Sequence, residues 1–322
     1  MFQSQKVLCL MGPTASGKTR LAIELSKRIP VRLISVDSAQ IYKGLDIGAG
    51  KPPQSVLEKH PHALIDIAHP HEPYTVHQFC QDANLEIKKA FEQKVLPVLV
   101  GGTMMYFKAL LEGMSPLPSS DPTLRQKLLE EGTQKGWEFM HQRLESLDPI
   151  TAARLKPTDA QRIQRALEVY YLTGKPLSGW HLTGKIASPY EFISVGLMPL
   201  EDERFKLHDN IAQRFYQMIE EGLEKEVASL LENPQNNPEL PAFRSVGYRQ
   251  TIQCLQGEFE RSLLPEKGIA ATRQLAKRQL TWLRSWHNLN KINCFDDNAF
   301  NHLLKLLQNE EVLDAKKMEQ VF

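Results

Sequence analysis

The stretch that decides the fold is the octapeptide Gly12-Pro13-Thr14-Ala15-Ser16-Gly17-Lys18-Thr19. It matches the phosphate-loop pattern G-x-x-x-x-G-K-[ST] at every fixed position. An apolar run at 7–11 precedes it and another at 21–25 follows it, as expected for a strand, a glycine loop and a helix. In that arrangement backbone N–H groups and the helix N-terminus surround an anion. The sequence therefore predicts that residues 12–19 bind phosphate groups.

Two side chains of this loop carry further chemistry. Lys18 adds a full positive charge, and the Thr19 hydroxyl is a candidate ligand of Mg²⁺. The loop indicates that a phosphorylated ligand binds. It identifies neither that ligand nor the reaction that the ligand undergoes.

Strands and helices alternate outward from the loop. The expected strands are 6–11, 32–36, 64–67 and 95–100, and the expected helices are 18–29 and 76–94. This alternation predicts an α/β fold with a parallel sheet of the P-loop NTPase type, covered by helices on both faces. Ligands of such sheets bind at the carboxyl ends of the strands.

A Pro- and Ser-rich segment at 114–122 interrupts the alternation, and Asp121-Pro122 is a typical helix start. The pattern from there to about residue 175 is helical, and 191–197 is typical of another buried strand. We therefore predict a P-loop α/β core made of 1–115 and 190–322, with C-terminal helices. A helical insertion domain at 116–189 divides it.

Composition limits the class of protein. The chain has 322 residues, of which 42% are hydrophobic and 24% charged, as in ordinary globular proteins. We expect neither a membrane span nor an N-terminal signal peptide. The cysteines are scattered and form no C-x-x-C pair, which favours a reducing cytoplasm over structural zinc: Cys9, Cys80, Cys254 and Cys294.

Positive charge is concentrated near the C-terminus, although the formal net charge is only +1. Residues 241–290 contain eight Lys and Arg against three Glu. A face that binds a polyanion and a solvated helix surface both explain this excess. On the helix expected at 270–287, Arg273, Lys277 and Arg284 fall within about 40° of one another. The apolar residues expected to pack inward are Leu275, Ala276, Trp282, Leu283 and Trp286.

Asp37 follows the expected strand at 32–36 and so lies at the same sheet edge as the phosphate loop. Three interpretations remain open for it: holding Mg²⁺ through a water, accepting a proton as a general base, or forming a turn or helix cap. Thr103 follows Gly101 and Gly102 at the next strand end, where the paired glycines permit close approach of a ligand.

Several other polar groups stand out in the sequence. Five histidines have spacing that does not match a structural zinc site, and we expect their loop to shape a substrate pocket: His60, His62, His69, His71 and His77. Arg162 and Arg165 lie three residues apart on one helix face. The segment at 244–249 combines two Arg, a Gly and a Tyr, which suits stacking on a base or contact with a nucleic-acid backbone.

Taken together, six motifs resemble the bacterial tRNA dimethylallyltransferases, also called tRNA isopentenyltransferases. They occur in family order from about residue 6 to 290: GPTASGKT, SVDSAQIYKGLDIGAGKP, LVGGTMMYFKALLEG, DAQRIQRALEV, FRSVGYRQ and ATRQLAKRQLTWLR. The resemblance implies transfer of a dimethylallyl group from its diphosphate to N6 of the adenine 3′ to the anticodon. It also implies a P-loop core and an insertion that binds the anticodon arm of tRNA. We further expect the protein to be a monomer.

The resemblance assigns roles residue by residue. Asp37 becomes the general base, with Thr103 and Lys18 also catalytic, and residues 12–19 hold the diphosphate with Mg²⁺ on Thr19. The residues expected to contact tRNA are Asp37, Ser38, Ala39, Gln40, Thr103, Arg125, Gln161, Arg162, Ile163, Gln164, Arg165, Arg244, Ser245, Val246, Gly247, Tyr248, Arg249, Lys277, Arg278, Gln279, Leu280, Thr281, Trp282, Leu283 and Arg284.

Two other function classes stay open at this point. A small-molecule kinase would use the same loop to bind ATP and Asp37 to bind Mg²⁺ or to act as a base. It would leave the basic helix without a role. A nucleotide switch or a non-enzymatic RNA-binding protein is the third class, and the lack of an N-K-x-D motif weighs against a GTPase.

Overall fold

The structure, a computed structural model, describes residues 5–182, 184 and 188–313. Residues 1–4, where we expected no signal peptide, lie outside this range. Residues 183 and 185–187 of the predicted insertion lie outside it as well. The strands are β1 (Lys6–Met11), β2 (Val31–Val36), β3 (His62–Ala63), β4 (Leu96–Gly101), β5 (Glu191–Met198) and β6 (Asn290–Asn293). The α-helices are α1 (Lys18–Arg28), α2 (Gln54–Lys59), α3 (Val76–Glu92), α4 (Met104–Glu112), α5 (Pro122–Lys135), α6 (Trp137–Leu147), α7 (Pro149–Ala152), α8 (Ala160–Thr173), α9 (Leu177–Leu182), α10 (Arg204–Glu221), α11 (Leu223–Glu232), α12 (Tyr248–Leu255), α13 (Leu264–Arg284) and α14 (Ala299–Asn309).

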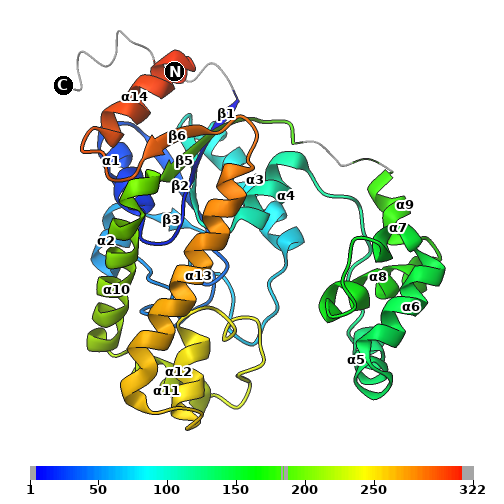
Figure 1. Cartoon of the computed structure of the whole chain (residues 1–322). Helices are drawn as coiled ribbons and strands as arrows, with labels where there is room; N and C mark the ends of the chain where they lie inside the picture. The colour runs from blue at the N-terminus through cyan, green and yellow to red at the C-terminus, as the bar shows by residue number, and fades with distance from the viewer. Residues whose placement is uncertain (1–4, 183, 185–187, 314–322) are drawn as a thin grey trace. The chain divides into compact units, whose positions relative to one another are not determined.

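All six strands form one parallel sheet in the order β3-β2-β4-β1-β5-β6 (Figure 1). The predicted parallel α/β fold is therefore confirmed. β1 lies inside the sheet, between β4 and β5, so the phosphate loop that follows it opens at the centre of the carboxyl edge. In open α/β sheets this edge is where ligands bind.

Alternating residues of the strands divide between two faces of the sheet. Leu8, Val98 and Val195 belong to one buried cluster that includes α1 and α14. α3 packs against β2 and β4 but contributes nothing to that cluster, so it covers the opposite face. Burying both faces explains why these strands are nearly continuous apolar runs.

The observed strands differ from the predicted ones in two places. The strand expected at 64–67 is wrong, because Leu64 and Asp66 have positive φ angles of 66° and 57° that extended backbone does not adopt. The pairing strand is instead the two-residue β3, which lies just before this turn. β6 was not predicted, because the short polar sequence Asn-Lys-Ile-Asn has only one buried side chain.

The chain divides into two compact units. Unit 1 comprises Met1–Ala109 and Pro189–Phe322, and unit 2 comprises Leu110–Ser188. The division falls inside α4, ahead of the Pro- and Ser-rich segment in which we placed the boundary at residue 116. In unit 2, Asp121 accepts a hydrogen bond from the Leu124 amide and Pro122 occupies the first turn, which confirms the expected helix start.

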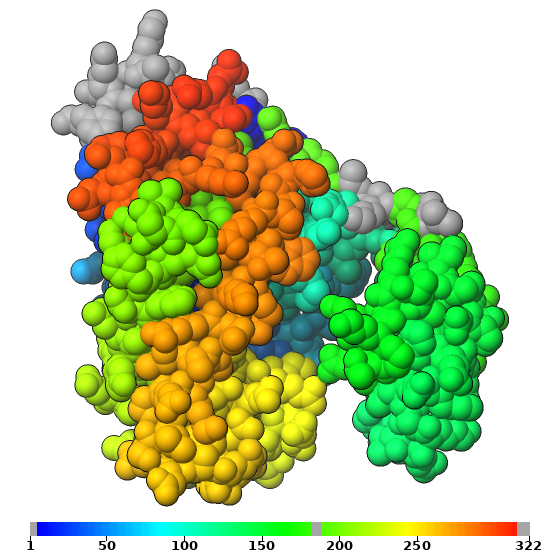
Figure 2. Space-filling model, viewed as in Figure 1, coloured from blue at the N-terminus to red at the C-terminus, as the bar shows by residue number. Residues whose placement is uncertain are grey.

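Each unit has its own apolar core. Unit 2 packs α5, α6, α7 and α8 around Leu128, Met140 and Leu167. Unit 1 has a second cluster between its C-terminal helices, where Ile211 and Phe215 of α10 lie in the same cluster as α13. α13 runs beside α10, and one of its faces is exposed to solvent (Figure 2). Among the described residues, no helix combines the length and apolar character needed to cross a membrane.

Candidate active site

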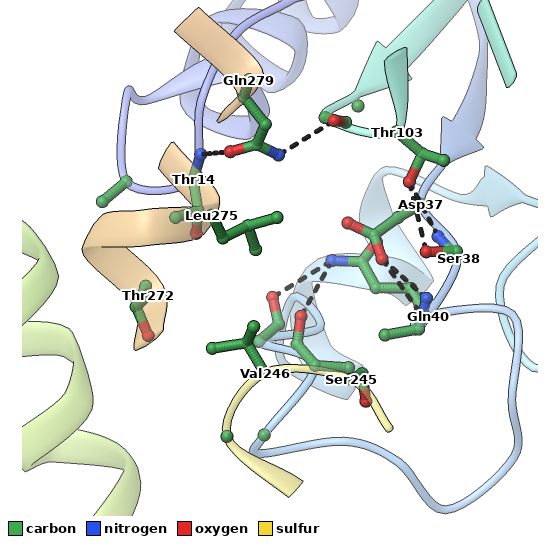
Figure 3. A pocket seen from close by; sticks show the side chains of 18 of the residues that line it. Thr14, Asp37, Ser38, Gln40, Thr103, Ser245, Val246, Thr272, Leu275 and Gln279 are labelled. Carbon is green, nitrogen blue, oxygen red and sulfur yellow. Dashed lines mark hydrogen bonds between the residues drawn. The ribbon is translucent and has the colours of Figure 1, made fainter. Parts of the chain in front are cut away.

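A cavity of about 580 Å³ lies at the carboxyl edge of the sheet in unit 1 (Figure 3). Its walls come from the phosphate loop, the loops after β2 and β4, the 244–247 segment, α10 and α13. The predicted convergence of three strand ends is therefore observed. The histidines of 60–77 do not line it, so our expectation that their loop shapes this pocket is wrong.

The phosphate loop has the backbone conformation that an anion site needs. Ala15 and Gly17 have positive φ angles of 63° and 79°, and α1 begins at the next residue, Lys18. Alternation of left- and right-handed residues turns successive N–H groups toward one point. The Ser16 hydroxyl is buried there and has no hydrogen-bond partner among the residues that the structure describes. An unpaired buried hydroxyl beside such a loop fits a ligand with acceptor oxygens.

Two cations face this loop. The Lys18 ammonium donates to the Pro13 carbonyl at 2.6 Å. Burial lowers the pKa of Lys18 to about 8, and the charge of Arg214 adds to the effect, while Asp37 acts in the opposite direction. Arg214 of α10 donates to the Thr14 hydroxyl at 3.4 Å and to the Gly50 carbonyl at 3.2 Å. Two partly buried cations without an equal number of carboxylates create a site for an anion.

Asp37 is partly buried at the opposite wall of the cavity. Its Oδ1 accepts hydrogen bonds from the amides of Ala39 at 2.9 Å and Gln40 at 3.3 Å. These bonds fix the carboxylate as a turn former. Oδ2 has no partner within the described part of the chain and is available to a substrate proton. The turn-former and general-base interpretations are therefore compatible, because they use different oxygens.

Thr103 connects the ends of β2 and β4. Its Oγ1 accepts from the Ser38 amide at 3.1 Å, and its own amide donates to the Val36 carbonyl at 3.2 Å (Figure 3). Gly101 lies so close to Val36 that a side chain there would overlap the neighbouring strand. Gly101 thus permits a close approach of two strand ends, and both glycines line the cavity, where a ligand could approach them.

Glu226 of α11 fixes the loop at 46–50, part of which lines the cavity. The Glu226 carboxylate accepts from the amides of Asp46, Ile47 and Gly48 at 3.1, 2.7 and 3.2 Å. The buried Tyr248 hydroxyl donates to the same carboxylate at 2.5 Å. One charged group therefore fixes the loop whose next residues line the site, and such charge-assisted bonds are stronger than neutral ones.

Residues 40–286 match the family model of IPP transferase. A tRNA dimethylallyltransferase of Coxiella burnetii is 48% identical over 309 residues, which cover 96% of this chain and 99% of the relative.

The chain belongs to the IPP transferase family.

Further relatives match nearly the whole of this chain. The tRNA dimethylallyltransferase 2 of Hahella chejuensis is 46% identical over 93% of this chain and 94% of its own. The crystal structure of the tRNA isopentenylpyrophosphate transferase of Bacillus halodurans has a TM-score of 0.69 and 32% identity, covering 98% of this chain and 100% of that one. A eukaryotic dimethylallyltransferase, solved acting on tRNA, has a TM-score of 0.82 and 26% identity over 96% of this chain and 80% of its own.

Several residues that we expected at the RNA surface of this IPP transferase fold have buried side chains. Tyr248, Leu280 and Leu283 belong to the interior of unit 1, and Ile163 to that of unit 2. Gln279 is also buried and forms its hydrogen bonds inside the cavity wall. These side chains pack within their own units, which makes them less accessible than the exposed residues of the same motifs.

Other predicted residues are exposed. In unit 1, Arg244, Arg249, Lys277, Arg278, Thr281 and Arg284 have exposed side chains. In unit 2, Gln161 and Arg162 are exposed, whereas Gln164 is buried and donates to the Arg125 carbonyl at 2.7 Å. Arg165 is held by Glu168 and the Pro118 carbonyl, both at 2.7 Å.

Trp282 was placed on the wrong face by the helical pattern. Its side chain is 38% exposed, lies at the cavity wall, and has the Lys108 ammonium 5.5 Å from its ring centroid. Arg214, in contrast, was missed altogether. It falls in an ordinary amphipathic helix and in no motif, so no sequence signal marks it as a residue of the site.

Proposed function

We propose that this chain transfers a dimethylallyl group from dimethylallyl diphosphate to N6 of the adenine 3′ to the anticodon of tRNA. The observation that carries the proposal is a single cavity with a cationic phosphate site on one wall and the Asp37 carboxylate on the other. Membership of the IPP transferase family favours this reaction over the small-molecule kinase.

The phosphate loop would hold the diphosphate as a leaving group. When the C–O bond of the donor breaks, negative charge grows on the diphosphate oxygens. The phosphate loop, Lys18 and Arg214 line the cavity, where they can stabilise this charge. No phosphoryl group is transferred in this scheme, and ATP is not required.

Asp37 would act on the acceptor. The adenine N6 is a weak nucleophile because its lone pair is delocalised into the ring, so proton removal as the C–N bond forms lowers the barrier. Oδ2 is the oxygen available for this proton, since Oδ1 is occupied by two amides. The adenine must leave its stack of neighbouring tRNA bases to reach the cavity.

The donor set at this edge fits Mg²⁺. Thr19 and Asp37 both line the cavity and offer oxygen ligands, which Mg²⁺ prefers. No group of three or more His, Cys, Asp or Glu side chains able to hold a metal occurs in 5–182, 184 or 188–313. We therefore propose Thr19 as the direct protein ligand, with substrate phosphate oxygens completing the shell. Mg²⁺ bound there would neutralise charge on the diphosphate.

The exposed cations support the RNA part of the proposal. Lys277 and Arg278 lie on α13 next to the cavity, and Trp282 presents an aromatic face for stacking at its rim. In unit 2, Arg162 is 75% exposed at its side chain. We propose that this unit contacts the anticodon arm. We also propose a cytoplasmic monomer, which accords with the four free cysteines.

A direct assay distinguishes the candidate reactions. Purified protein is incubated with Mg²⁺, unmodified tRNA and radiolabelled dimethylallyl diphosphate, or with labelled ATP in place of the donor. We expect label in tRNA from the first donor only, mapped to the adenine 3′ to the anticodon. Label transferred from the γ-phosphate of ATP to a small molecule would instead establish the kinase.

The lowered pKa of Lys18 predicts that diphosphate binding takes up protons. A bound anion stabilises the charged ammonium and raises the pKa of Lys18. At about pH 8.5, just above the pKa of about 8 in the protein without ligand, Lys18 therefore gains a proton on binding. Affinity for diphosphate should fall as pH rises through this range. Titration calorimetry in buffers of different ionisation enthalpy measures the uptake. Lys18→Met should abolish the part due to Lys18, and an unchanged uptake would contradict the assignment.

The basic side chains of α13 predict a salt effect. We expect Lys277→Ala to weaken tRNA binding and to reduce the slope of log K against log salt by about one. Arg284→Ala should have a smaller effect, because Arg284 is paired with Glu201 at 2.9 Å. Filter binding at several salt concentrations measures the slope, with Lys305→Ala on α14 as the matched control. A slope equal to that of the control would assign Lys277 to the solvated surface.

A further inference from the structure

The amide group of Gln279 joins two separate parts of the cavity wall. Its Oε1 accepts a hydrogen bond from the Thr14 amide of the phosphate loop at 2.9 Å. Its Nε2 donates to the Gly102 carbonyl, after β4, also at 2.9 Å (Figure 3). The side chain is 9% exposed and uses both halves of its amide, which is the arrangement expected of a structural bridge.

Gly102, the second partner of Gln279, is connected to Asp37, the proposed general base. Gly102 precedes Thr103, whose Oγ1 accepts from the Ser38 amide at 3.1 Å, and Ser38 follows Asp37. A continuous series of contacts therefore runs from Thr14 through Gln279 and Thr103 to the turn that carries Asp37. It connects the wall that binds the leaving group with the wall that removes the proton.

Position 102 is adapted to this contact. A side chain there would collide with the Gln279 amide nitrogen, so glycine gives α13 the space to approach. Gln274 and Lys277 of the same helix are exposed, whereas Gln279 lies on the buried face with Leu280. The inward direction of Gln279 separates it from the RNA-facing residues with which the motif groups it.

We propose that Gln279 is a positioning residue that sets the spacing between the diphosphate site and Asp37. The proposal rests on the proposed function for its kinetic meaning. It assigns Gln279 no contact with tRNA. Reacting groups must be held within a fraction of an ångström, and a displacement of about 1 Å lowers the rate on the order of 100-fold.

The test compares Gln279→Met and Gln279→Glu with the control Gln274→Met, which makes the same change on the exposed face of the same helix. Methionine keeps the length of the side chain and removes both hydrogen bonds. Glutamate retains an acceptor for the Thr14 amide but opposes the Gly102 carbonyl with a carboxylate oxygen. At saturating tRNA and donor we expect both Gln279 variants to react about 10- to 100-fold more slowly.

Two binding measurements accompany the rates. The tRNA dissociation constant of Gln279→Met should stay within about twofold of the wild type, because no RNA contact is removed. Its affinity for inorganic diphosphate with Mg²⁺, measured by calorimetry, should fall about threefold to tenfold, as expected for the loss of a hydrogen bond that orders the loop. The control should match the wild type in all three measurements.

Three results would overturn the proposal: weaker tRNA binding with an unchanged saturated rate, a wild-type rate in Gln279→Glu, or a diphosphate affinity and a rate per folded molecule that both equal the wild type. Failure of the proposed function is recognised separately, because the wild-type enzyme itself would then fail to label tRNA. The diphosphate titration still tests the bridge in that case.

Discussion

Replacing Asp37 by Asn is expected to slow the single-turnover reaction about 10²- to 10⁴-fold, because the amide cannot accept the N6 proton. The turn should survive, since the Asn oxygen still accepts from the amides of Ala39 and Gln40. The tRNA dissociation constant should change by less than about twofold, because the substitution alters only the group that accepts the proton. Rapid quench with labelled dimethylallyl diphosphate and a separate binding titration measure the two effects.

The control for this variant is Asp209→Asn, which removes one negative charge from the exposed surface of α10. It should react at the wild-type rate. A rate for Asp37→Asn within about tenfold of the wild type would exclude Asp37 as the general base. Asp37 would then keep only its role in the turn.

Replacing Arg214 by Met is the second change with a large expected effect. The guanidinium is partly buried, bonds the Thr14 hydroxyl and acts on the charge of Lys18, so its removal takes one of two cations from the proposed diphosphate site. Loss of one such preorganised group typically lowers kcat by about 10²- to 10³-fold. Affinity for inorganic diphosphate should fall as well, because the same cation attracts the bound anion.

Arg214→Lys refines this test. Lysine restores the charge but lacks the two guanidinium nitrogens that bond the Thr14 hydroxyl and the Gly50 carbonyl. The rate of Arg214→Lys should therefore lie between those of Arg214→Met and the wild type. Arg261→Met, which removes an exposed arginine paired with Glu224, serves as the control. Equal rates in Arg214→Met and the wild type would show that Lys18 and the loop amides suffice.

The sequence predicts those parts of this molecule that depend on local pattern. The phosphate loop has a fixed spacing of glycines, and β1, β2, β4 and β5 are long apolar runs, so both could be located in advance. β3 and β6 could not, because they are short and their pairing depends on the neighbouring strand. The left-handed Leu64 likewise gives no signal in the residue type.

The site was harder to predict than the fold, since distance in sequence hides contacts. Gln279 bonds the Thr14 amide across 265 positions, and Arg214 reaches the Thr14 hydroxyl across 200. Helical periodicity shows which residues share a face but not what that face meets, so Trp282 was placed in the core. The motif near the C-terminus mixes residues that face outward with Gln279, which faces inward.

The interrupted core has a consequence for the order of synthesis. Unit 2 is one continuous segment, so it is synthesised without interruption after the N-terminal segment of unit 1. β1, in contrast, lacks its neighbour β5 until residue 198 has emerged, and the phosphate loop lacks Gln279 until most of α13 has followed. The nascent chain therefore carries its anion-binding sequence for most of translation without the surroundings that complete it. The cavity is complete only after α13 has been synthesised.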